Sequence, residues 1–270
     1  MSIIITGANG KLGSLIIKHL LEKIPAQQII ACVRHPEKAS EYLAQGIEVR
    51  YGDYDQPESL DKAFTGASKL LLISSSNNDD TIRVRQHAHV IEAAKKAKVE
   101  HILFTSFAFL GTGNMSPSHQ YLATEHAILT SGIPHTFLRN ALYTDFVGVL
   151  GLKEAISKGE LVTYPGDWLF NTVTRNDLAL GIAAVLASPD HKNKTYELTA
   201  SRAWSFEELA NILSELSGKP ITHRQDPQVQ NWIYGFLGKL DTSSTSLDLE
   251  QLIGGPVATL KESIQPFIAP

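Results

Sequence analysis

The most constraining feature of this chain is a glycine-rich segment near its amino terminus. TGANGKLG follows the apolar run SIIIT (2–6) directly and places Gly7, Gly10 and Gly13 ahead of a helix-length segment. Glycines at such spacing let the chain turn tightly, approach a pyrophosphate without a Cβ clash and pack the helix closely on the strand. The free N–H groups at the helix start favour phosphate binding. We therefore predict a nucleotide-binding turn, with a glycine-rich turn that binds nothing as the alternative.

Short β-rich runs alternate with helix-length segments through the first half of the chain. Strands are expected over 2–6, 28–34, 47–53, 69–75, 101–107 and 133–139, and helices over 11–24, 36–46, 57–66, 81–99 and 118–132. This order is expected of a parallel, doubly wound sheet, the Rossmann type of α/β fold.

Beyond about residue 140 the pattern is less regular. Helices are expected over 141–157, 176–187, 205–217, 227–238 and 257–268, and short strands near 161–163, 171–174 and 195–199. We predict an NAD(P)-binding Rossmann domain over 1–140 and a smaller α+β substrate lobe over 141–270, with segments that return to the first sheet. The stretch TSSTS (242–246) is expected to be a mobile loop.

Composition excludes several classes of protein. The 24 Lys+Arg and 28 Asp+Glu residues give a net charge of −4, without the basic stripe that nucleic acid requires. The single cysteine, Cys32, excludes an intrachain disulfide, and no histidine pattern predicts a metal site. No apolar run approaches the roughly 18 residues of a membrane span, and MSIIITG does not resemble a signal peptide. We expect a cytoplasmic monomer or homodimer.

The end of the second expected strand indicates which nucleotide is bound. NAD enzymes usually carry an acidic residue there to hold the ribose hydroxyls, whereas this chain has Val33, Arg34 and His35. A guanidinium at this position accepts a 2′-phosphate, and Lys38 is near enough in sequence to assist. We therefore predict NADPH rather than NADH, with a solvated surface arginine as the alternative.

Polar residues at other strand ends complete the expected cofactor site, because these ends face the ligand crevice in this fold. Asp53 either accepts the adenine amino group or caps the helix at Pro57. For each hydroxyl, a strand end satisfied within the protein is the alternative. The expected cofactor residues are Gly7, Asn9, Gly10, Lys11, Leu12, Gly13, Arg34, Asp53, Tyr54, Ser74, Ser75, Ser76, Thr105 and Ser106.

Several segments together resemble the NmrA-like branch of the atypical short-chain dehydrogenases. They are TGANGKLG, VRHPEKA, GDYDQPESL, KLLLISSS, HILFTSF, TEHAILTSGIPHTFLRNALY and KTYELTASRAWSFEELA. Within that branch the chain is most similar to the bacterial NADPH-dependent quinone oxidoreductases, with triphenylmethane reductases next. The resemblance implies NADPH and hydride transfer to a quinone or similar electron-poor aromatic acceptor. It also places Arg139, Asn140 and Tyr143 beside a substrate cleft.

The chain departs from that family at a position that bears on catalysis. Family members commonly have lysine in a TEK motif, where this chain has TEH and therefore His126. The Tyr-x-x-x-Lys pair of ordinary short-chain enzymes is also absent, since Glu125 follows Tyr121 by four residues. His126 is either a proton donor, a ribose ligand or a surface residue, and Tyr121 is either a cleft donor or a packing residue. The catalytic candidates are His126, Tyr121, Asn140 and Tyr143.

Two functions compete on these observations. The first is an NADPH-dependent oxidoreductase that acts on a small quinone or aromatic substrate. The alternative is an NmrA-like redox sensor that binds the dinucleotide without catalysis, which the missing lysine favours. An epimerase is disfavoured, because such enzymes use the Tyr-x-x-x-Lys pair.

Overall fold

A computed structural model describes residues 2–111 and 119–268 of the chain. Its main element is a seven-stranded sheet with the order β3-β2-β1-β4-β5-β6-β9. The strands are β1 Ile3–Thr6, β2 Ile29–Val33, β3 Glu48–Tyr51, β4 Lys69–Leu72, β5 His101–Phe107, β6 His135–Asn140 and β9 Lys194–Leu198. The first six pair in parallel, and the order reverses between β1 and β4. The predicted doubly wound α/β sheet is confirmed.

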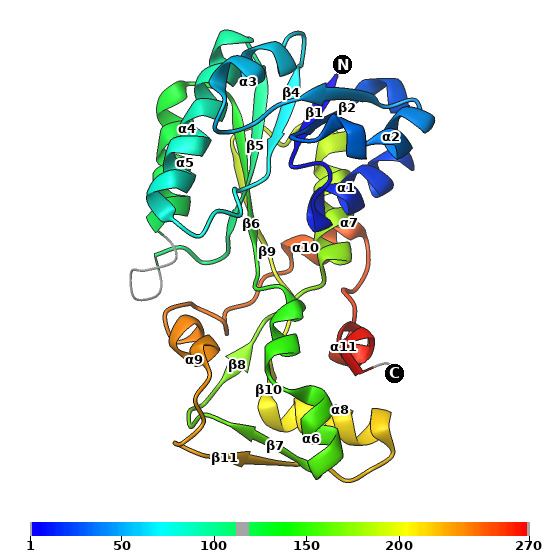
Figure 1. The fold of residues 1–270 in the computed structure, drawn as a ribbon, viewed down its shortest axis with the longest axis vertical. Coiled ribbons are helices and arrows are strands. Elements are labelled where there is room, and N and C mark those ends of the chain that lie inside the picture. Colours follow the sequence, from blue (N-terminus) through cyan, green and yellow to red (C-terminus); the bar gives the residue numbers. More distant parts are fainter. Residues whose placement is uncertain (1, 112–118, 269–270) are drawn as a thin grey trace. The chain divides into compact units, whose positions relative to one another are not determined.

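Helices cover both faces of this sheet. They are α1 Lys11–Leu21, α2 Ser40–Ala44, α3 Pro57–Ala63, α4 Asp80–Lys96, α5 His119–Ser131 and α7 Arg175–Ala187, with 3-10 turns at Ala26–Gln28 and Pro36–Lys38. Figure 1 shows α4 and α5 side by side on one face, and α1 with α7 on the other. Because both faces are covered, β1 and β4 are buried along their whole length. This explains their continuous apolar runs.

The chain divides into two compact units. The first comprises 2–107, 119–140 and 178–196, so the segment 178–196 joins a unit built mostly from the first half of the chain. The second contains η3 Thr144–Val149, α6 Leu152–Lys158, β7 Glu160–Thr163, β8 Leu169–Phe170, β10 Trp204–Ser205, α8 Phe206–Ser217, β11 Thr222–Gln225, α9 Trp232–Leu237, α10 Asp248–Ile253 and α11 Leu260–Ile268. Its core is aromatic, with Phe170 and Trp204 at a ring-centroid distance of 4.9 Å.

The second unit is where the expected elements differ most from the structure. The expected helix over 141–157 is wrong: η3 and α6 are separate, and Gly151 between them has a left-handed φ of 70°. Tyr143 is instead extended, because it forms a parallel bridge with Val173. The expected helix over 227–238 begins only at Trp232, because the Asn231 side chain accepts a hydrogen bond from the Ile233 N–H and caps it.

Other differences concern short segments. The strand expected at 171–174 lies at Leu169–Phe170, and β10, β11 and α10 were not expected. The expected loop 242–246 is hydrogen-bonded at both ends. Thr242 donates to the Leu169 carbonyl, and the Ser246 N–H donates to Thr199. In the first unit, β4 ends at Leu72, so Ser74, Ser75 and Ser76 lie in the loop beyond the strand.

The buried side chain of His87 connects the loop at Ser74–Ser76 to α4 and α5. The Ser75 N–H donates to Nε2 of His87 on α4 at 2.8 Å, and Nδ1 of His87 lies 2.8 Å from the Thr124 hydroxyl on α5. Thr124 gives its own proton to the Gln120 carbonyl, so Nδ1 is the nitrogen that donates. Both bonds therefore require a neutral His87, and burial lowers its pKa to about 3.

We predict that His87 makes the fold sensitive to mild acid. Its pKa lies below the ordinary value of 6.5, so its stabilising effect is complete above that value and is lost as pH falls towards 3. Lowering the pH from about 7 to about 5 should reduce the free energy of unfolding by about 2 kcal/mol through His87 alone. Urea unfolding of the wild type and of His87→Gln at both pH values measures this. An equal pH dependence in both proteins would refute the prediction.

Candidate functional site

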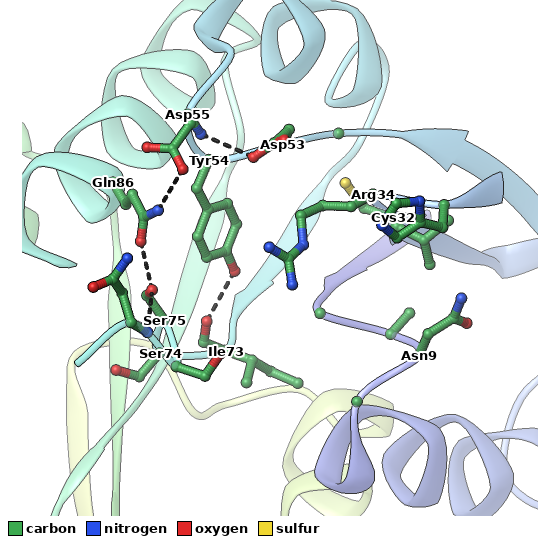
Figure 2. A pocket seen from close by; sticks show the side chains of 18 of the residues that line it. Asn9, Cys32, Arg34, Asp53, Tyr54, Asp55, Ile73, Ser74, Ser75 and Gln86 are labelled. Atoms are coloured by element: carbon green, nitrogen blue, oxygen red, sulfur yellow. Dashed lines mark hydrogen bonds between the residues drawn. The ribbon is translucent and has the colours of Figure 1, made fainter. Parts of the chain in front are cut away.

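A pocket of about 490 Å³ lies in the first unit, at the carboxyl ends of the central strands (Figure 2). This is the edge of the sheet where strand order reverses, the position at which such folds bind ligands. It contains nine of the fourteen expected cofactor residues: Gly7, Asn9, Gly10, Arg34, Asp53, Tyr54, Ser74, Ser75 and Ser76. The remaining five are Lys11, Leu12, Gly13, Thr105 and Ser106, which do not line it.

The glycine-rich turn forms one wall of the pocket. Gly7 has a φ of 61°, and its carbonyl accepts a hydrogen bond from the Gly10 N–H at 2.9 Å. A Cβ on Gly13 would lie 2.4 Å from the Gly7 carbonyl oxygen, so α1 contacts the turn with no space for a side chain. The Tyr42 hydroxyl donates to the Ala8 carbonyl at 2.8 Å and holds the turn from its other side. The helix N-terminus therefore meets the pocket at a fixed position.

Positive charge gathers at one end of the pocket. Arg34, His35 and Lys38 line it, and Figure 2 shows the Arg34 side chain extending towards Tyr54. His35 lies 3.2 Å from the Glu37 carboxylate. Arg34 and Lys38 are exposed, and neither forms a hydrogen bond or ion pair within 2–111 and 119–268. Two unpaired cations are thus available to an anionic ligand.

Asp53 and Tyr54 occupy the wall that follows β3. The Asp53 carboxylate accepts a hydrogen bond from the Asp55 N–H, and α3 has Gln56 rather than Asp53 at its N-cap. The Tyr54 hydroxyl lies 2.5 Å from Thr6 Oγ1 and 2.8 Å from the Ile73 carbonyl. Burial raises the pKa of Tyr54, which keeps its phenol protonated. Tyr54 therefore joins the ends of β1 and β4 beneath the pocket.

Some of the expected hydroxyl residues line the pocket, and others support its loop from behind. Thr105 is buried and accepts a hydrogen bond from the Ser74 N–H at 2.9 Å, so it supports the loop from behind. The Ser75 hydroxyl donates to Gln86 Oε1 at 2.5 Å, and Gln86 in turn donates to the Asp55 carboxylate. Ser106 is buried on β5, and its Oγ has no hydrogen-bond partner among the described residues.

The expected catalytic residues lie in different surroundings, and none lines this pocket. His126 is exposed on α5. Asn140 is buried at the end of β6, and its Oδ1 has no hydrogen-bond partner in the described parts of the chain. Tyr143, in the second unit, has the Arg175 guanidinium carbon 4.2 Å from its ring centroid. Tyr121, on α5, accepts a hydrogen bond from Arg83.

Arg139 forms a structural ion pair with Glu125. Its Nε and Nη2 bind the buried Glu125 carboxylate at 2.9 and 2.7 Å, which joins β6 to α5. This pairing also explains why Glu125 stands four residues after Tyr121, where short-chain enzymes carry lysine. Glu125 is the partner of a strand residue.

Sequence reasoning missed the contribution of α4. Gln86 and Asp55 line the pocket and bind each other, and Arg83 reaches Ser74 from the same helix. No motif marks these residues, because their approach to the loop depends on how α4 packs.

Cys32 also lines the pocket, but burial raises its pKa to about 12, so the thiol remains protonated.

Two further observations bear on the class of site. Within the described residues, no cluster of three or more His, Cys, Asp or Glu side chains could hold a metal ion. The described helices include none that is long and apolar enough to cross a membrane.

Comparison with known proteins gives consistent matches over most of the chain. The model of the NAD(P)H-binding family matches residues 7–189. Quinone oxidoreductase 2 of Escherichia coli is 35% identical, over 97% of both chains. The structure of Citrobacter triphenylmethane reductase complexed with NADP(H) superposes with a TM-score of 0.91 at 47% identity, over 99% of this chain and 100% of that one. The NADPH complex of the Escherichia coli quinone oxidoreductase gives 0.87 at 35% identity, with the same coverage.

We predict that Gly13→Ala damages the turn. The added Cβ would contact the Gly7 carbonyl, and such overpacking costs about 1–3 kcal/mol. Thermal unfolding and titration with NADPH should show a lower Tm and a raised Kd. Gly235→Ala is the matched control, because its Cβ would have no neighbour within 4 Å and it lies in helix α9. Equal behaviour of the two variants would contradict the prediction.

Proposed function

This chain belongs to the NAD(P)H-binding family, and we propose that it is an NADPH-dependent oxidoreductase that reduces a quinone or similarly electron-poor aromatic substrate. The observation that carries the proposal is the full-length similarity to two reductases of known structure, one at 47% and one at 35% identity. The first is named for triphenylmethane dyes and the second for quinones. Both substrate classes are conjugated, electron-poor hydride acceptors.

The pocket suits NADPH in shape and charge. The Gly7–Gly13 turn lines the pocket and precedes α1, whose first backbone N–H groups can bind the diphosphate. Arg34 and Lys38, unpaired among the described residues, can bind the 2′-phosphate, and Asp53 can accept the adenine amino group. Bound NADPH would supply the hydride; the protein's part is to bind, orient and exclude water.

A quinone acceptor also fits a site with few side chains that could act as a general acid or base. Reduction of a quinone gives a hydroquinone anion, whose charge is spread over the ring. A weakly acidic side chain is sufficient to protonate it, so the absence of a Tyr-x-x-x-Lys pair does not exclude this reaction. The protein is proposed to act in the cytoplasm on small molecules.

Turnover tests this function directly. We expect the purified protein to oxidise NADPH in the presence of quinones, azo dyes or triphenylmethane dyes, with NADH much less effective. Steady-state absorbance of NADPH across such a panel is the measurement. NADPH binding without turnover on any acceptor would overturn the reductase proposal and favour the redox sensor.

Charge reversal at the pocket entrance tests the cofactor preference. Arg34→Glu should weaken NADPH binding by about 10- to 100-fold, because it replaces a charge-assisted hydrogen-bond donor with a repulsive carboxylate. NADH, which has no 2′-phosphate, should lose much less. Lys18→Glu is the matched control, since Lys18 is exposed on α1 and does not line the pocket. Equal losses for both nucleotides would refute the role of Arg34.

A further inference from the structure

Arg83 on α4 carries a half-buried guanidinium that the proposed function leaves unexplained. Its Nη2 donates to the Ser74 hydroxyl at 3.1 Å and to the Tyr121 hydroxyl at 3.1 Å. One nitrogen therefore holds a residue of the cofactor pocket and a residue of α5, with their oxygens at most about 6 Å apart. Although Tyr121 does not line the pocket, Arg83 keeps its hydroxyl close to it.

Both hydroxyls have a proton to give. Neither the Ser74 nor the Tyr121 hydroxyl donates a hydrogen bond to any described residue, because each only accepts from Arg83. A hydroxyl oxygen that accepts a bond from a cation is a better donor through its own hydrogen. Arg83 thus presents two oriented O–H donors beside a pocket that fits a dinucleotide.

No carboxylate among the described residues lies close enough to Arg83 to compete strongly with these two oxygens for its guanidinium. Its nearest carboxylate is the half-exposed Asp80, at 3.7 Å from Nη1, and its buried Nε has no partner in 2–111 or 119–268. When the Gln120 amide is oriented with its oxygen towards the guanidinium, that oxygen lies 2.9 Å from Nη2. The cation is therefore held by neutral groups and only weakly compensated.

The Tyr121 ring is fixed as well. It packs against Phe107 and Phe104 at centroid distances of 5.9 and 6.4 Å. The guanidinium carbon of Arg83 lies 5.2 Å from the centroid of the same ring, so Arg83 contacts both the ring and its hydroxyl. The phenol can change its environment only if these rings or Arg83 move.

We propose that Arg83 is a positioning residue that aims the Ser74 hydroxyl at the bound cofactor and Tyr121 at the substrate as its proton donor. The inference rests on the proposed reductase function. Tyr121 gives its proton to the substrate oxygen that becomes anionic as the ring accepts the hydride, and water returns a proton to Tyr121. Each turnover then consumes one NADPH and one solvent proton and forms one hydroquinone. Arg83 stabilises the transient phenolate, as lysine does in the Tyr-x-x-x-Lys pair, but from another helix.

The first test measures cofactor binding without turnover. Arg83→Met and Ser74→Ala should each weaken NADPH binding by about 2- to 10-fold, the effect of one hydrogen bond. The double variant should bind no more weakly than either single variant, because both changes remove the same donor. Additive losses would overturn the coupling. Lys96→Met removes a charge from the same helix at an exposed ion pair with Asp61, which does not line the pocket, and should leave NADPH binding unchanged.

The second test measures catalysis with a series of quinones. Tyr121→Phe should lower kcat by about 100-fold at nearly constant KM for NADPH. The loss should grow as the hydroquinone product becomes a weaker acid, since that anion needs the proton more. Arg83→Met should reproduce this trend, the double variant should be no slower than Tyr121→Phe, and Arg83→Lys should recover most of the rate. These readouts depend on proton donation, and a purely structural Arg83 would not produce them.

The outcomes separate the two proposals. If the wild type reduces no acceptor, the proposed function fails, while the binding experiment still decides whether Arg83 acts through Ser74. If the wild type is active and Tyr121→Phe has wild-type kcat with every quinone, the role of Tyr121 is refuted. Thermal unfolding of each variant shows whether the fold persists, and Ser74→Ala and Tyr121→Phe keep the proposal falsifiable if Arg83→Met does not fold.

Discussion

The close approach of α1 to the turn that precedes it is the constraint on which the site depends. The Gly13 backbone lies against the Gly7 carbonyl, and even one methyl group there would collide with it. This contact places the amino end of α1 at the carboxyl ends of the central strands. The wall of the pocket that contains Gly7 and Gly10 follows from it. The Tyr42 bond to Ala8 keeps that arrangement fixed from the opposite side.

Behind the turn, the pocket is maintained by polar groups of α4 and α5. Each of the loop residues Ser74 and Ser75 is held by a side chain of α4, through Arg83 and His87. The two His87 bonds form in only one protonation state, so they fix the loop more specifically than apolar packing would. The same network extends to Tyr121 and Thr124 on α5. Cofactor pocket and candidate proton donor are therefore parts of one hydrogen-bonded layer.

Much of this could be predicted because it depends on local pattern. Glycine spacing, alternating elements and an arginine in place of an acidic residue gave the parallel sheet, the turn and the basic end of the pocket. The second unit was harder, because Gly151 and Asn231 divide or shorten helices by single-residue effects. Thr105 and Ser106 were expected to line the pocket, yet both are buried within β5, which continues past them to Phe107, and neither lines it.

The sequence alone determined the nucleotide-binding class of this protein, because tight turns and strand periodicity are encoded by residues close together in the chain. It could not determine which side chains support the site. Arg83 and Tyr121 are 38 positions apart, Gln86 and Asp55 are 31 apart, and their contacts exist only because α4 packs against α5 and the β3–α3 segment. His126 occupies the sequence position of the family lysine, yet the helix leaves it exposed to solvent. Tertiary packing decided these points, since it sets which helix face meets the sheet.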